Sequence, residues 1–148
     1  MHVKRIVVLP VFVGALGAVA LGQRHPDFSG EWVLVAQSNR QLRASPTLSV
    51  RQNASTLVTG HGSGLHSSTY MLDGKEHTVT NQGVTSVTKA QWMGEKLVIE
   101  RVDSYPHGLR RQTKQVWSLA EGKLTMEFTD LSNPQEVKIH SNTYAKKK

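Results

Sequence analysis

A chain of 148 residues with 38% hydrophobic and 20% charged residues has the size and composition of a single globular domain. It contains no cysteine, which excludes disulfides, thiolate catalysis and cysteine-based zinc sites. The formal net charge of +7 is spread along the chain without a basic helix or a glycine-rich phosphate loop, so nucleic acid is not an expected partner.

The first 22 residues have the pattern of a signal peptide. A short basic start precedes an apolar run over residues 6–21, which ends in small residues. This run is shorter than the roughly 20 apolar residues that a membrane span needs. We therefore expect cleavage after Ala20 or Gly22, a mature domain over residues 23–148, no stable membrane insertion after cleavage, and a periplasmic or secreted location.

After the leader, short runs of alternating apolar and polar residues predict β-strands, and turn-forming residues separate them. In chain order the expected strands are 30–37, 47–52, 56–59, 67–72, 77–81, 84–93, 96–102, 109–119, 123–129 and 137–145. No window of a dozen residues shows a helical period. The pattern predicts an all-β fold, a single antiparallel meander barrel of about eight to ten strands. An immunoglobulin-like sandwich is the alternative.

The connections carry specific turn chemistry. Asp73-Gly74 is the strongest hairpin signal, and it predicts that strand 77–81 returns along strand 67–72. The glycine-rich segment Gly60–Gly64 is expected to be a mobile loop. Asn53-Ala54-Ser55 predicts a surface turn and forms a glycosylation sequon. Asp103–Gly108 is expected to be the next connection.

The stretch Phe28-Ser29-Gly30-Glu31-Trp32 resembles the F-x-G-x-W start of the calycin superfamily, the lipocalins and intracellular lipid-binding proteins. Later pieces agree with it in order: Leu72-Asp73-Gly74-Lys75-Glu76, Trp92-Met93-Gly94-Glu95-Lys96-Leu97-Val98-Ile99, Val116-Trp117-Ser118-Leu119 and Gly122-Lys123-Leu124. Over residues 26–146 the chain resembles small secreted bacterial proteins of lipocalin-like fold. This resemblance implies a plain barrel and leaves the class of ligand open.

Two features of the resemblance bear on the closed end of the barrel. Residues 38–46 are too few for the helix pair that intracellular lipid-binding proteins insert after their first strand. Both groups tend to lay a late basic side chain over the first-strand tryptophan, and the candidates here are Lys138, His140 and Lys146.

The opening motif also makes physical sense as a structural plug. Gly30 allows a sharp turn into the barrel base, where a side chain would collide. Trp32 would then fill that end and bury roughly 200 Å², with Phe28 as a lid just outside the strand. We expect these three residues to be structural rather than to bind a ligand.

Barrels of this size hold either packed side chains or one small ligand. If the small residues of strand 84–93 point inward, they leave room for a ligand, and Gln112 and Lys114 on a neighbouring strand could add polar groups or face water. The candidate cavity residues are Ser86, Thr88, Ala90, Trp92, Gln112, Trp117, Met126 and Phe128. The alternative for the apolar ones is that they only pack the core.

No motif for catalysis or metal binding is evident. His61, His66 and His77 fall in neighbouring segments and are the best set for a hydrolase, an isomerase or a metal site. They lack the spacing of known zinc motifs, and the chain has no G-x-S-x-G sequence. Neither metal nor cofactor is expected.

The sequence therefore predicts a non-catalytic barrel that binds a small apolar or amphipathic molecule. The alternative is a protein-interaction module, such as an inhibitor or an accessory protein with an envelope partner. It would act through end loops, with Gly60–Gly64 and Asp103–Gly108 as the candidates.

Overall fold

Ten antiparallel strands make up nearly all of the fold in the computed structural model, which describes residues 24–62 and 66–148. The expected signal peptide lies outside the described residues. Within them, no helix is long and apolar enough to cross a membrane. The strands are β1 (Gly30–Gln37), β2 (Thr47–Gln52), β3 (Thr56–His61), β4 (His66–Met71), β5 (Glu76–Asn81), β6 (Val84–Met93), β7 (Lys96–Ser104), β8 (Arg110–Ala120), β9 (Lys123–Asp130) and β10 (Lys138–Lys146), with a short 3-10 turn, η1, at Pro106–Gly108.

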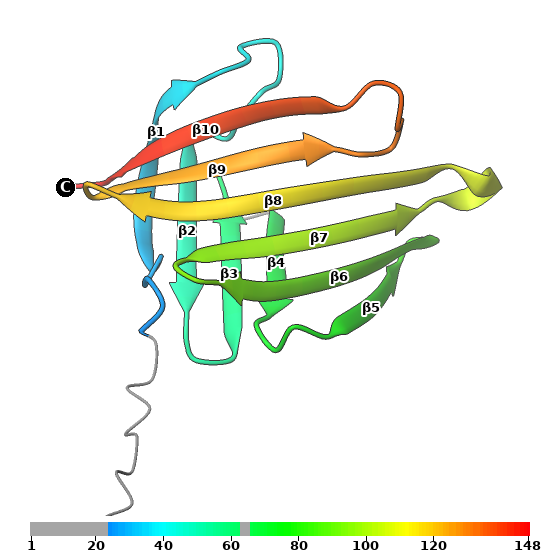
Figure 1. The fold of residues 1–148 in the computed structure, drawn as a ribbon, viewed down its shortest axis with the longest axis horizontal. Helices are drawn as coiled ribbons and strands as arrows, with labels where there is room; N and C mark the ends of the chain where they lie inside the picture. The colour runs from blue at the N-terminus through cyan, green and yellow to red at the C-terminus, as the bar shows by residue number, and fades with distance from the viewer. Residues whose placement is uncertain (1–23, 63–65) are drawn as a thin grey trace, which may run out of the picture.

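All ten strands belong to one sheet in the order β4-β3-β2-β1-β10-β9-β8-β7-β6-β5. Every pairing joins strands that are consecutive in the chain, except that β1 pairs with β10. Figure 1 shows β6 to β10 side by side in one layer and β2 to β4 crossing behind them at a steep angle. One continuous meander therefore wraps into a nearly closed barrel, which confirms the predicted fold class and excludes the two-sheet sandwich.

The barrel is open between β4 and β5, and here the hairpin prediction was wrong. The Asp73-Gly74 turn forms, but the two strands that it joins stand at opposite ends of the sheet and do not pair. Instead, the Gly74 amide donates to the Ala90 carbonyl of β6 at 3.0 Å. His77 folds back onto the Asp73 carboxylate at 2.9 Å. The turn thus docks on β6 and leaves a gap where a hairpin ladder would be.

The end of the barrel that contains the start of β1 is closed by a tightly packed core. The Trp32 indole is 1% exposed, and its Nε1 donates to the Phe28 carbonyl at 2.9 Å. Of the late basic candidates, Lys146 is the one that lies over Trp32, with its Nζ 5.5 Å from the ring centroid. Around these residues pack the fully buried side chains of Leu48, Leu57, Leu97, Ile99, Trp117 and Leu124.

Gly30 adopts a backbone conformation that favours glycine, with φ at +142°. A Cβ at this position would lie 3.1 Å from Lys146 Cε, so a side chain would also press on the lysine above Trp32. Phe28 comes just before β1 and is completely buried, with its ring 5.7 Å from those of Trp92 and Trp117. The opening motif therefore forms the floor of the barrel.

The glycine-rich segment differs from the expected loop at its start, because Gly60 and His61 belong to β3. Gly60 pairs with Ser49 on one side and Ser67 on the other. A Cβ on Gly60 would sit only 2.6 Å from Ser49 Oγ, so this glycine permits close packing inside the sheet rather than a turn. Residues 63–65 lie outside the described residues.

Candidate ligand-binding site

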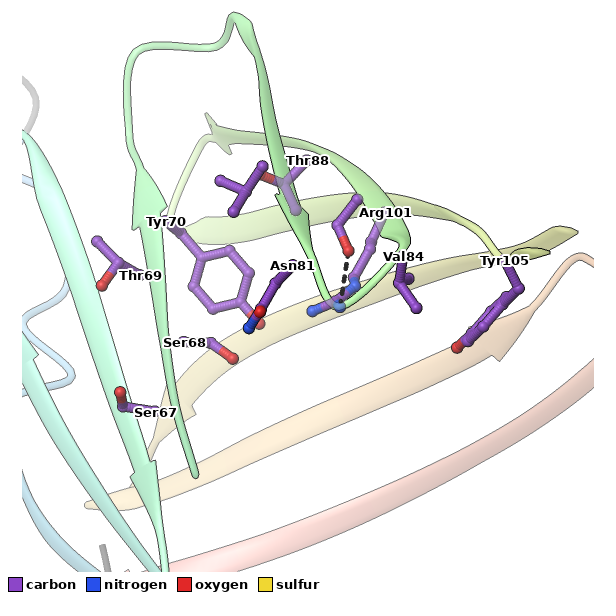
Figure 2. A pocket seen from close by; sticks show the side chains of 11 residues that line it. Ser67, Ser68, Thr69, Tyr70, Asn81, Val84, Thr88, Arg101 and Tyr105 are labelled. Carbon is purple, nitrogen blue, oxygen red and sulfur yellow. Dashed lines mark hydrogen bonds between the residues drawn. The ribbon is translucent and has the colours of Figure 1, made fainter. Parts of the chain in front are cut away.

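Two cavities occupy the half of the barrel away from the packed floor. The first, of about 440 Å³, lies in the gap between β4 on one side and β5, β6 and β7 on the other (Figure 2). The second, of about 380 Å³, lies against β7, β8, β9 and β10. Arg101 and Tyr105 line both. Each volume is in the range of small-molecule sites in proteins.

A partly buried polar network lies between the two cavities, and its Arg101 lines both of them. On β7, Ile99, Arg101 and Asp103 alternate toward the barrel interior, and the register of β6 places Ser86 opposite Asp103. The Arg101 Nε donates to both Asp103 carboxylate oxygens, at 2.8 and 2.9 Å. Ser86 Oγ donates to Asp103 Oδ1 at 2.5 Å and accepts from Arg101 Nη2 at 3.1 Å, the contact dashed in Figure 2.

This network is a charged group inside the protein. Asp103 is only 8% exposed, and two thirds of the Arg101 side chain is covered. Burial acts to lower the pKa of Arg101, but the hydrogen bond and negative charge of Asp103 outweigh it, so the pKa of the guanidinium is raised. Arg101 therefore remains a cation, and its charge is neutralised by an adjacent carboxylate.

A second pair of opposite charges lies at the far side of the second cavity. Arg111 Nη2 is 3.6 Å from Asp130 Oδ2. Hydrogen bonds from the Ser132 side chain and backbone lower the pKa of Asp130, with a smaller effect from Arg111. Nearby, the His140 ring stacks on Phe128 at 4.9 Å. Burial and, to a lesser extent, Arg111 lower the pKa of His140, which makes the imidazole neutral at pH 7.

Apolar and hydroxyl groups complete the lining. Figure 2 shows Tyr70 from β4, Val84 and Thr88 from β6, and Tyr105 beyond β7 around the first cavity. Among the residues that line the second cavity, Phe128 is the purely hydrocarbon side chain. A partly open space lined by both apolar and polar groups is able to hold a small molecule and to orient it.

The sequence-based candidates fall into three groups. Ser86 and Thr88 line the first cavity and Phe128 lines the second. Ala90, Trp117 and Met126 face inward but belong to the packed core, at no more than 3% exposure. These three cannot contact a ligand without a rearrangement of the core.

Two candidates lie elsewhere. Trp92 is at the closed end, where its ring stacks on His25 at 4.3 Å. Of the two facings open to Gln112, the structure shows the one toward water: it is exposed on the outside of β8, and Arg111, Thr113 and Gln115 line the cavity instead. A one-residue error in register exchanges the two faces of a strand.

The central residues Arg101 and Asp103 were missed. Asp103 was expected to begin a connection, but β7 extends through Ser104 and the turn η1 follows only at Pro106. The available signal was the continuation of the inward face from Ile99 by two charged residues at alternate positions. Charges on the buried face of a strand are rare unless they are paired.

The three histidines do not form a shared site. His61 pairs with His66 across the β3–β4 ladder, and burial, with a smaller effect from His66, lowers the pKa of His61. His77 instead bonds Asp73 in the exposed β4–β5 turn. Over residues 24–62 and 66–148, no group of three or more histidine, aspartate or glutamate side chains could hold a metal ion.

Comparisons with known proteins identify the fold. No protein-family model matches the chain, and no curated protein matches its sequence. Among solved structures, it is similar to Caenorhabditis elegans lipid binding protein 8 (TM-score 0.61, 15% identity, 81% of this chain and 95% of that one). Zebrafish ileal bile acid-binding protein, solved with cholic acid, gives a TM-score of 0.56 at 19% identity and coverages of 81% and 98%.

Secretory abundant heat soluble protein 4 from Ramazzottius varieornatus is also similar, with a TM-score of 0.54, 15% identity and coverages of 81% and 94%. At such identities the likeness concerns the fold. The chain has the calycin-type β-barrel fold found in lipid-binding and fatty-acid-binding proteins.

Proposed function

We propose that this chain is a non-catalytic binding protein that holds one small amphipathic molecule in the open half of its barrel. The observation that carries the proposal is the partly buried network of Ser86, Arg101 and Asp103 between two cavities. Apolar side chains of similar volume generally stabilise a barrel interior as well as a buried ion pair does. A polar network at this place therefore points to a ligand with a polar group to orient.

The rest of the cavity suits the apolar part of such a molecule. Ring faces and aliphatic surface lie on either side of the network, from Phe128, Tyr105, Tyr70 and Val84. Solved proteins of the same fold include a fatty-acid-binding protein and a bile acid-binding protein in complex with cholic acid, which is itself amphipathic. This supports a small lipid-like ligand for the present chain.

The location of the protein is part of the proposal. The pattern of residues 1–22 supports a protein outside the cytoplasm, in the periplasm or the medium. Edman sequencing of the protein secreted by cells that express the full chain tests this point. A mature N-terminus at Leu21 or Gln23 supports it, and an uncleaved, cytosolic product contradicts it.

Binding can be tested by native mass spectrometry of the purified protein and by displacement of the neutral fluorescent probe N-phenyl-1-naphthylamine. We expect a 1:1 adduct and competition by amphipathic molecules. Arg101→Gln should weaken the competition. Glu100→Gln, an exposed position on the same strand, should not affect it. No adduct and no displacement by fatty acids, monoacylglycerols, sterols or fatty amines would contradict the proposal.

A protein-interaction role is the second candidate, because apolar side chains are exposed at the open end. Leu109, just before β8, is 66% exposed. Val137, just before β10, is 48% exposed, and Ile139 in β10 is 65% exposed. A crosslinking pulldown from the envelope fraction should yield a partner that is lost in a Leu109→Ser, Ile139→Ser variant. If the same proteins are recovered with this variant, the open end is not the interaction surface.

A further inference from the structure

The positive charges around the two cavities are already neutralised by the protein, and this restricts the chemistry of the ligand. We propose that the polar group of the bound molecule is uncharged and hydrogen-bonding, a hydroxyl or a carboxamide, rather than a carboxylate or an amine. The inference rests on the proposed binding function and makes it more specific. It follows from how Arg101 and Arg111 are paired and from which polar atoms remain open.

Arg101 is the innermost cation, and it does not present a free charge. Its Nε is held by both oxygens of Asp103, and its Nη2 by Ser86. A ligand carboxylate that approached the guanidinium would also approach the Asp103 carboxylate, which is 8% exposed and poorly screened by water. The repulsion between the two anions would cancel much of the attraction to Arg101. A ligand cation would be attracted by the Asp103 carboxylate but repelled by the adjacent Arg101 guanidinium.

The second cavity is balanced in the same way. Arg111 faces Asp130 at 3.6 Å, and His140, whose pKa is lowered by burial and by Arg111, carries no charge at pH 7. The cavity thus contains two cations and two anions in pairs, without an unpaired charge among its lining residues. A charged ligand would lose part of its hydration here without finding an unpaired counter-ion among these residues.

Hydrogen-bonding groups, in contrast, remain available. Gln115 lines the second cavity, and its Oε1 is occupied by Trp117 Nε1 at 3.0 Å. In the part of the chain that the structure describes, no acceptor takes a hydrogen bond from its amide nitrogen, which leaves a donor facing the cavity. The hydroxyl groups of Tyr105 and Thr113 lie on the same wall and can donate or accept.

A buried acceptor lies one step further along the inner face of β10. Asn142 follows the cavity-lining His140 by two residues, is 5% exposed, and its Oδ1 has no hydrogen-bond partner among the described residues. A ligand that reached this oxygen would have to bring a donor, which a hydroxyl, an amide or an ammonium group supplies but a carboxylate does not. A neutral group that both donates and accepts therefore matches the interior better than an anion does.

A matched series of ligands tests the inference. Dodecanoic acid, dodecanamide, monododecanoylglycerol and dodecylamine share a twelve-carbon chain and differ in the polar group. Their dissociation constants can be measured by titration calorimetry and by probe displacement at pH 7.5. We expect the two neutral ligands to bind at least about tenfold more tightly than the acid and the amine, a difference that corresponds to about one well-made hydrogen bond.

Asp103→Asn then tests the cause of this preference. The substitution keeps the shape of the side chain but removes its negative charge, so that the charge of Arg101 becomes available to the ligand. We expect the affinity for dodecanoic acid to rise by about tenfold or more and the acid to overtake the amide. The matched control is Glu100→Gln, which makes the same change of charge on the exposed face of β7 and should leave the ranking unchanged.

The outcomes distinguish a failure of the neutral-ligand inference from a failure of the proposed binding function. If dodecanoic acid binds the unaltered protein as tightly as the neutral ligands do, the inference is wrong while the binding function stands. If no member of the series binds and no sterol displaces the probe either, the proposed function itself fails and the inference with it. The ranking on the unaltered protein needs no variant, so the test holds even if Asp103→Asn does not fold.

Discussion

Replacing the whole Ser86–Arg101–Asp103 network by apolar side chains should leave the barrel about as stable as before, whereas removing one member should not. Asp103→Leu alone leaves Arg101 without its carboxylate. Breaking a fully buried pair costs about 3–5 kcal/mol. Because a third of the Arg101 side chain is exposed and water can solvate it, we expect a loss of about 2–3 kcal/mol.

In the triple variant Ser86→Ala, Arg101→Met, Asp103→Leu no charge or hydroxyl is left unpaired. We expect its free energy of unfolding to lie within about 1 kcal/mol of the original, or above it. Urea unfolding followed by the fluorescence of the buried Trp32 and Trp117 measures both variants, and the single variant should shift the midpoint by about 1–2 M.

A triple variant that is as unstable as the single one would refute this reasoning. It would mean that the network is needed for the fold, and the main argument for its role in binding would be lost. Ligand displacement on a stable triple variant completes the test, because that variant should fold but bind the neutral ligands weakly.

Three further predictions concern the fold and its dependence on pH. Gly60→Ala should destabilise the barrel by about 1–2 kcal/mol because the new methyl meets Ser49 Oγ at 2.6 Å, and Ser49→Ala should restore most of that loss in a double-mutant cycle. Trp32→Phe should cost about 2 kcal/mol in urea unfolding, through the lost hydrogen bond to the Phe28 carbonyl and the smaller ring. Burial lowers the pKa of His61 below 6.5, so the unfolded chain binds the proton first, and the free energy of unfolding should fall as pH drops from 6.5 toward the native pKa. His61→Asn should flatten that part of the pH profile; an unchanged slope would contradict the assignment.

Much of the fold could be predicted because the signals are local. The alternation of Leu124, Met126 and Phe128 with polar residues identifies the inner face of β9, and two of these three side chains are buried in the core. Glycine-containing turns mark the ends of the long strands. The period of two and the turn chemistry of neighbouring residues determine both features without reference to distant parts of the chain.

The parts that could not be predicted depend on distant contacts or on polar strands. The gap between β4 and β5 arises because the turn at Gly74 bonds Ala90 of β6, which the turn residues themselves do not encode. β8 begins with six polar residues, Arg110 to Gln115, so the hydrophobic pattern does not indicate which of them, Gln112 included, face the barrel interior. Asp103 precedes a serine, a tyrosine and a proline and has the local character of a turn residue, while its partner Ser86 comes from another strand.

The seam between β1 and β10 has a consequence for how the barrel folds. Across it, the Ser141 amide donates to Ser38 Oγ over 103 positions of sequence, and the Lys147 amide reaches the Glu31 carbonyl at 2.8 Å. The ladder that joins the two halves of the sheet therefore requires a long-range loop closure, which places the refolding of such a topology in the range of milliseconds to seconds. Until β10 docks, β1 and β9 each expose an unpaired edge of the kind that promotes aggregation. Docking of β10 between β1 and β9 therefore removes two exposed strand edges in one step.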